Sequence, residues 1–273
     1  MAQEPLPLPV VDNHTHLGHA REGEQTEQVG VALAAAAAVN VTRVVQIGCD
    51  LESARWTVAM LDDNPEVLGG VALHPTEASD LGTAGFEAAF AEIEQLAAHP
   101  RVRVIGETGL DHYWVKADQP DGRAAQEVSF RRHIDLAKRT GKALQIHDRD
   151  AHADILRILG EEGAPEKTVF HCFSGDAEMA RFCADQGWYL SFAGPVTFKN
   201  AQPLREALLA VPLDRVLVET DAPYLAPHPY RGATNASALL PVTVRSMATV
   251  LGLAVESVCA AVDETSEAVY GPW

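Results

Sequence analysis

Eight short apolar runs recur along the chain, and a helical segment separates most of them from the next. Continuous apolar runs of this kind are typical of buried strands, and regular strand–helix alternation indicates a parallel sheet. Eight such units favour a (β/α)₈ TIM barrel over an open doubly wound sheet, and no GxGxxG follows the first run. The expected strands are Val10–His16, Arg43–Cys49, Val67–His74, Val102–Glu107, Ala143–His147, Thr168–Phe173, Tyr189–Ala193 and Val216–Thr220.

The length of 273 residues agrees with this fold class, because a one-domain (β/α)₈ barrel typically has about 250 residues. No internal repeat, linker or low-complexity tract interrupts the chain, so we predict one TIM-barrel domain over residues 1–273. The formal net charge of −17 argues against a nucleic-acid scaffold protein, which usually has a basic surface. It does not exclude a phosphate substrate, because bound divalent cations can reverse the local sign of charge.

The sequence also favours a cytoplasmic protein. The N-terminal segment MAQEPLPLPVV has neither the positive region nor the apolar region of a signal peptide. No apolar run approaches the roughly 20 residues that a membrane span needs. We therefore expect no membrane association, and no obligate protein partner is evident.

Six residues of metal-ligand type stand at or just past the ends of these apolar runs. Parallel strands of a barrel end at one rim, where the active sites of this fold lie. Four imidazoles and two carboxylates at such a rim favour two divalent cations rather than one. The six are His14, His16, Glu107, His147, His171 and Asp221.

The individual positions predict different tasks. His14 and His16 are two residues apart, so on a strand both rings face the same side. Glu107 has two carboxylate oxygens and can bridge two cations, although an internal salt bridge to Arg149 is the alternative. Asp221 is the candidate general base, because it can hydrogen-bond a water as well as bind a cation.

The motifs HTH, LHP, GETGLD, IHDRDA, HCFSG and ETDAP, in this order, resemble the TatD family of metal-dependent deoxyribonucleases. The matching blocks run from about Val11 to Asn235. The resemblance implies a TIM barrel and two-metal hydrolysis of phosphodiester bonds. By motif match, one cation would take His14, His16, Glu107 and Asp221, and the other would take Glu107, His147 and His171, with Glu107 shared.

Several residues are candidates to contact the substrate. His74 in LHP would meet a substrate phosphate or support a ligand. Cationic candidates to neutralise the phosphate oxygens are Arg149, Lys199, Arg231 and His112. Aromatic candidates to stack on a base are Phe173, Phe198 and Tyr230, with packing at the barrel mouth as the alternative for Phe173.

Three positions depart from the family pattern. Ala236 stands where the family commonly has Glu, Ala143 where it usually has Pro, and His112 where an aromatic residue is more frequent. None of them is among the predicted cation ligands. The change at Ala236 puts the fine structure of the loop after the eighth strand in doubt, and leaves the metal chemistry intact.

The resulting hypothesis is a 3′-to-5′ exonuclease that acts on single-stranded or frayed DNA with Mg²⁺ or Mn²⁺, while Zn²⁺ is also compatible with the imidazoles. Two alternatives stay open. One is an amidohydrolase-type esterase or amidase, including aminoacyl-tRNA ester hydrolysis, at the same metal site. The other is a binding protein with vestigial ligands.

Overall fold

The computed structural model describes residues 3–19 and 27–273. The strands are β1 Val10–Thr15, β2 Val41–Gly48, β3 Val67–Val71, β4 Val102–Asp111, β5 Ala143–Arg149, β6 Thr168–Phe170, β7 Tyr189–Phe192 and β8 Val216–Val218. The helices are α1 Val29–Ala37, α2 Leu51–Met60, α3 Pro75–Asp80, α4 Gly82–Leu96, α5 Pro120–Thr140, α6 His152–Glu162, α7 Ala177–Asp185, α8 Gln202–Leu209, α9 Leu240–Leu251 and α10 Val255–Tyr270. Three single turns of 3₁₀-helix are η1 Gly194–Thr197, η2 Leu213–Arg215 and η3 Ser237–Leu239.

The strands belong to one parallel sheet in the order β1 to β8, and helices alternate with them along the chain. A parallel bridge between Thr15 and Ala222 connects the end of β1 with the segment after β8. The predicted (β/α)₈ barrel is thereby confirmed. By its internal contacts the chain divides into two compact units, one made of the residues up to Gln46 with Cys172–Pro272, the other made essentially of Ile47–His171.

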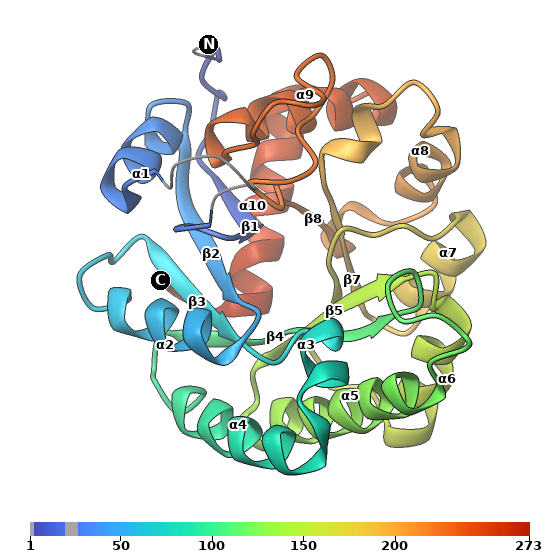
Figure 1. Cartoon of the computed structure of the whole chain (residues 1–273). Helices are drawn as coiled ribbons and strands as arrows, with labels where there is room; N and C mark the ends of the chain where they lie inside the picture. The colour runs from blue at the N-terminus through green and yellow to red at the C-terminus, as the bar shows by residue number, and fades with distance from the viewer. Residues whose placement is uncertain (1–2, 20–26) are drawn as a thin grey trace. The chain divides into compact units, whose positions relative to one another are not determined.

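The first unit contains β7, β8, β1 and most of β2. β7 pairs with β8, and β1 pairs with β2, both in parallel. Helix α10 packs along β1 and β8, as the red helix beside β1 in Figure 1 illustrates. Its Ser266 hydroxyl donates to Asn13 Oδ1 at 2.9 Å, and Asn13 Nδ2 donates to Val218 O at 2.7 Å. Buried hydrogen bonds therefore fix the position of β1 beside β8.

The second unit contains β3 to β6 and helices α2 to α6. β4 pairs with β3 on one side and with β5 on the other. It continues four residues beyond the predicted end at Glu107, to Asp111. Gly109 allows this extension, because its φ is +144° and a Cβ there would lie only 2.1 Å from the carbonyl oxygen of His147. Any larger residue would separate β4 from β5 at this point.

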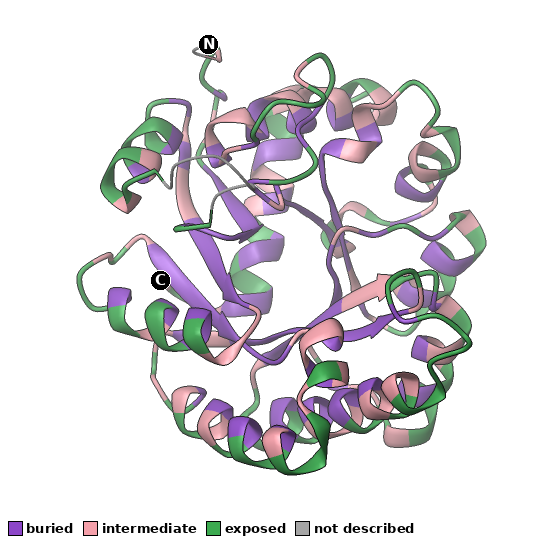
Figure 2. Ribbon diagram, in the orientation of Figure 1, coloured by how far each residue is buried: buried purple, intermediate pink, exposed green. Residues whose placement is uncertain are grey.

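In the second unit, β3, β4 and β6 are buried over almost their whole length and β5 over its first four residues, which explains the many apolar residues in their sequences. Figure 2 shows buried residues along β4 and β5 and exposed residues on the outward sides of α4 and α5. The helices bury only one face each, such as Phe86, Phe90 and Ile93 of α4. This amphipathic pattern is what the alternation of the sequence predicted.

A buried histidine of α5 makes folding sensitive to pH. His133 Nε2 accepts the Leu73 N–H at 3.2 Å, and its Nδ1 donates to Ser129 O at 2.8 Å. Burial lowers the pKa of His133 from 6.5 to about 4, so the ring stays neutral in the fold. As the pH falls below the unfolded-state value, the unfolded chain binds a proton that the folded chain does not. Stability is therefore lost between about pH 6.5 and pH 4.

We expect His133→Gln to remove this part of the pH dependence, because glutamine still offers an acceptor to Leu73. As the pH is lowered through that range, the free energy of unfolding of the wild type should fall by up to about 1.4 kcal/mol per pH unit more than that of His133→Gln. Urea denaturation at several pH values measures the difference. His228→Gln, a change on an exposed histidine, serves as the control. Equal pH dependence in the wild type and His133→Gln would refute the assignment.

In the part of the chain that the structure describes, no single helix is both long enough and apolar enough to cross a membrane. The bent helix pair Ser237–Leu251 and Val255–Tyr270 meets these criteria only when the two helices are taken together.

Candidate metal centres

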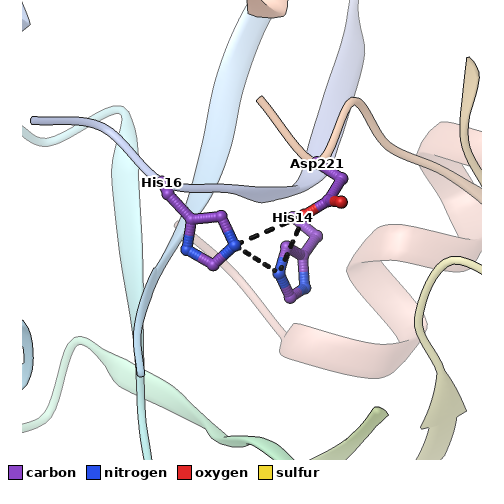
Figure 3. Close-up of side chains that lie close together, drawn as sticks. All are labelled: His14, His16 and Asp221. Atoms are coloured by element: carbon purple, nitrogen blue, oxygen red, sulfur yellow. Dashed lines mark hydrogen bonds and ion pairs between the residues drawn. The ribbon is translucent and has the colours of Figure 1, made fainter. Parts of the chain in front are cut away.

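The first unit brings His14, His16 and Asp221 together, and we call these three residues the His14 cluster. The Asp221 N–H donates to His14 O at 3.0 Å, and the His16 N–H donates to Ala222 O at 2.8 Å. These backbone hydrogen bonds hold the end of β1 against residues 221 and 222. Asp221 has a φ of +57°, a left-handed conformation that aspartate tolerates better than most residues. The turn directs its carboxylate toward both imidazoles (Figure 3).

The three side chains converge on one point. His14 Nε2 and His16 Nε2 lie 3.2 Å apart, and Asp221 Oδ1 lies 3.8 Å from the first and 3.3 Å from the second (Figure 3). A circle through the corners of this triangle has a radius of about 2.0 Å, and Zn²⁺ and Mg²⁺ hold nitrogen and oxygen ligands at about 2.0–2.2 Å. Both histidines are almost fully buried. The donor set, its spacing and its burial therefore fit a divalent cation.

A buried polar network lies beside the His14 cluster. Asp12 accepts hydrogen bonds from Thr220 N at 2.8 Å, from Thr220 Oγ1 at 2.6 Å and from Ser237 Oγ at 2.6 Å. Burial raises the pKa of Asp12 to about 7, against the opposing effect of these hydrogen bonds. Asn235 Nδ2 donates to Thr220 O and to Tyr224 O. Asp12 and Asn235 thus fix the segment that carries Asp221.

The second unit brings His74, Glu107, His147 and His171 together, and we call these four residues the Glu107 cluster. Glu107 Oε2 lies 3.1 Å from His147 Nδ1 and 2.9 Å from His171 Nε2. His74 Nε2 lies 3.3 Å from His147 Nδ1. His74, Glu107 and His147 offer ligand atoms that all lie within 4.8 Å of one another. Arg149, the alternative partner that the sequence suggested for Glu107, instead stacks on Tyr113.

Asp111 lies beside the Glu107 cluster and was not among the predicted site residues. Its Oδ2 lies 3.1 Å from His147 Nε2, so His147 Nε2–H donates to this buried carboxylate. The other nitrogen, Nδ1, is then the one directed toward Glu107. A carboxylate behind a ligating histidine fixes the tautomer and orientation of the ring. The signal was present in GETGLD, whose Asp lies four residues after Glu107, but the strand was expected to end at Glu107.

His74 differs from its neighbours in its hydrogen bonds. The Thr76 N–H donates to His74 Nδ1 at 3.2 Å, where Nδ1 also lies 2.6 Å from Thr76 Oγ1. Because Nδ1 accepts a hydrogen bond, the proton of the neutral ring resides on Nε2. His74 Nε2 is thus suited to donate to an anion.

The charge state of the Glu107 cluster follows from its neighbours. Burial alone would raise the pKa of Glu107, but the charge of His171 and the hydrogen bonds with His147 and His171 hold this pKa well below its usual range. Burial would lower the pKa of His147, whereas its bonds to Asp111 and Glu107 raise it. An ionised Glu107 among imidazoles is the state in which a carboxylate binds cations.

The other predicted substrate contacts are mostly exposed side chains. In the first unit, Lys199 and Arg231 are exposed, and the Arg231 guanidinium lies 4.7 Å from the centre of the Phe198 ring. In the second unit, His112 Nδ1 lies 4.0 Å from Asp154, and Arg149 is exposed. For Phe173 the structure favours the packing alternative, because the side chain is buried and its ring centre lies 5.9 Å from that of Phe192.

Comparison with known proteins agrees with this arrangement. The model of the TatD related DNase family matches residues 11–271. The metal-dependent hydrolase TatD of Mycobacterium tuberculosis is 47% identical over 265 residues, which cover 96% of this chain and 98% of that protein. The metal-dependent hydrolase YabD of Bacillus subtilis is 35% identical and covers 95% of this chain and 98% of its own length. Both relatives are described as uncharacterized metal-dependent hydrolases.

Solved structures show the same fold. YjjV, a TatD homologue from Escherichia coli, superimposes with a TM-score of 0.86 at 20% identity and covers 97% of this chain and 98% of its own. A TatD family hydrolase from Entamoeba histolytica gives a TM-score of 0.85 at 17% identity, covering 98% and 100%. With the family match over nearly the whole sequence, these findings establish that the chain belongs to the TatD family of metal-dependent hydrolases.

Proposed function

We propose that this hydrolase is a deoxyribonuclease that removes nucleotides from the 3′ end of single-stranded or frayed DNA. The observation that carries the proposal is the convergence of His14, His16 and Asp221 on one point at ligand distance. The family description names DNA hydrolysis, and a two-cation site is a recurrent solution for phosphodiester cleavage.

We propose that each cluster holds one divalent cation. His14, His16 and Asp221 would hold the first, and Glu107, His147 and His171 would hold the second. Magnesium or manganese suits a mixed imidazole and carboxylate set, and zinc also suits the imidazoles. An amidohydrolase from Burkholderia multivorans, which shares the fold with a TM-score of 0.65 at 13% identity and covers 96% of this chain and 99% of its own, was solved with bound zinc.

The cations would supply Lewis-acid stabilisation of the phosphate charge and activation of the attacking water. The residues of the chain perform the other tasks. Asp221 accepts the proton of that water as general base. His74 Nε2–H donates to a phosphate oxygen, and Asp111 keeps His147 in the tautomer whose Nδ1 faces Glu107. Arg149, Lys199, Arg231 and His112 are the candidates to offset the remaining charge of the DNA backbone.

The test is hydrolysis of single-stranded DNA by protein stripped of metal and then supplied with Mg²⁺, Mn²⁺ or Zn²⁺. Oligonucleotides labelled at the 5′ end or at the 3′ end reveal the direction of digestion. We expect activity only with added metal, release of the 3′ label as mononucleotide at once, and progressive shortening of the 5′-labelled strand.

A protein that cleaves an ester or amide substrate but no DNA with any of the three metals would contradict the nuclease proposal. Digestion from the 5′ end would contradict only its direction. A duplex with flush ends, compared with the same duplex carrying a 3′ overhang, tests the preference for single strands.

A further inference from the structure

The loop after β4 exposes two aromatic side chains in succession, Tyr113 and Trp114. Trp114 is 63% exposed and Tyr113 is 41% exposed, although both rings are large and largely apolar. The rings meet edge to face with their centres 5.0 Å apart. Fold stability gains little from an indole that remains in water to this extent. The exposure of Trp114 therefore favours a role in binding.

Two cations accompany these rings. Arg149 lies 4.2 Å from the centre of the Tyr113 ring and 5.9 Å from that of Trp114, and Lys116 Nζ lies 4.5 Å from the centre of the Tyr113 ring. Within residues 3–19 and 27–273, neither cation is within ion-pair distance of a carboxylate. In contrast, neighbouring arginines of this unit such as Arg131 and Arg157 form ion pairs.

The position of the exposed rings is fixed by the backbone. Asp111 Oδ1 accepts the N–H of Tyr113 at 2.9 Å and the N–H of Trp114 at 2.8 Å. The other oxygen of the same carboxylate accepts from His147 of the Glu107 cluster. Parallel pairing sets Asp111 of β4 beside Arg149 of β5, and the His112 N–H donates to Arg149 O. One buried carboxylate thus connects the cluster with the exposed rings.

We propose that Tyr113, Trp114, Lys116 and Arg149 form a platform for single-stranded DNA, on which a base of the substrate stacks against Trp114 while the two cations contact its phosphates. The inference rests on the proposed function and names the residues that set its preference for single strands. An aromatic face with adjacent unpaired cations is complementary to a nucleotide, which has a flat base and a negative phosphate. Because the net charge of the chain is −17, two cations beside the exposed rings favour the binding of a phosphate at this place.

The platform predicts a loss of binding that depends on the base. We expect Trp114→Ala to raise the KM for an oligothymidylate about tenfold, since stacking on one aromatic ring contributes a factor of this order, while kcat changes less than twofold. Trp114→Phe should restore most of the affinity, because phenylalanine keeps a stacking face. Trp56→Ala, on a partly exposed tryptophan of α2, is the matched control and should leave both constants unchanged.

A substrate without bases separates stacking from other effects. On an oligonucleotide of abasic residues, the wild type and Trp114→Ala should have the same KM. Arg149→Gln should raise the KM for oligothymidylate and for the abasic oligonucleotide, and both KM values should then depend less on the salt concentration. An unchanged KM of Trp114→Ala on oligothymidylate would overturn the proposal, and so would an equal rise on the abasic substrate.

Binding without cleavage distinguishes this proposal from the proposed function. The affinity of the metal-loaded protein for a phosphorothioate-linked oligothymidylate is measured by fluorescence anisotropy. If the wild type hydrolyses no DNA but Trp114→Ala still binds this probe about tenfold more weakly, the nuclease proposal fails and the platform stands. If both proteins bind it equally, the platform is refuted whatever the activity.

Discussion

Glu107→Ala should abolish the metal-dependent activity, with kcat/KM reduced at least about 1,000-fold, or about 4 kcal/mol in transition-state stabilisation. Glu107 Oε2 is the atom that His147 and His171 both approach, so its removal leaves the Glu107 cluster with imidazoles alone. Neutral imidazoles without a carboxylate hold a hard cation weakly, because Mg²⁺ prefers oxygen ligands. The activity assay on single-stranded DNA is therefore combined with the metal content of the purified protein.

The loss of the cation has a second, independent readout. A ligand that binds only the folded state stabilises it, by about 2.7 kcal/mol at 100 times its Kd. We expect Mn²⁺ to raise the melting temperature of the wild type and to raise that of Glu107→Ala distinctly less. Glu87→Ala, which removes an exposed glutamate of the same unit, controls for the loss of a carboxylate. Wild-type activity and metal content in Glu107→Ala would exclude Glu107 as a ligand.

The strand positions of the fold were predictable because its strands are buried on both faces. Such strands are rich in apolar residues, and the residues where they begin agree with the structure at β1, β3, β4, β5, β6, β7 and β8. Their ends were less predictable. β4 continues past the ionisable Glu107 because Gly109 permits close contact with the backbone of His147, and this depends on a neighbouring strand. The prediction of one domain over residues 1–273 stays a prediction.

The candidate ligands could be predicted because polar residues at the ends of apolar strands are few and chemically distinctive. All six fall in the two clusters, His14, His16 and Asp221 in the first and Glu107, His147 and His171 in the second. The supporting residues Asp12 and Asp111 were not predicted, since their partners Thr220, Ser237 and His147 lie far away in sequence. A hydrogen bond between distant segments leaves no periodic signal in either.

The left-handed turn at Asp221 also had no sequence signal, although the geometry of the His14 cluster depends on it. Asp221→Asn is the conservative test, because asparagine has nearly the same size and tolerates the same positive φ. The change removes the negative charge and the ability to take up a proton. We expect kcat to fall by about 10²- to 10⁴-fold, the range that general-base catalysis contributes. The measurement is the initial rate on single-stranded DNA at saturating substrate.

The concentration of metal then separates the two tasks of Asp221. If the carboxylate only bound the cation at Oδ1, beside His14 and His16, a higher concentration of Mn²⁺ would refill the weakened site and restore kcat in Asp221→Asn. If it also accepts the proton of the attacking water, kcat stays low at saturating metal, because the amide cannot act as a base. Asp214→Asn, an exposed aspartate of η2, should behave like the wild type at every metal concentration. Full recovery of kcat in Asp221→Asn would therefore support Asp221 as a cation ligand. It would also mean that another residue is the general base.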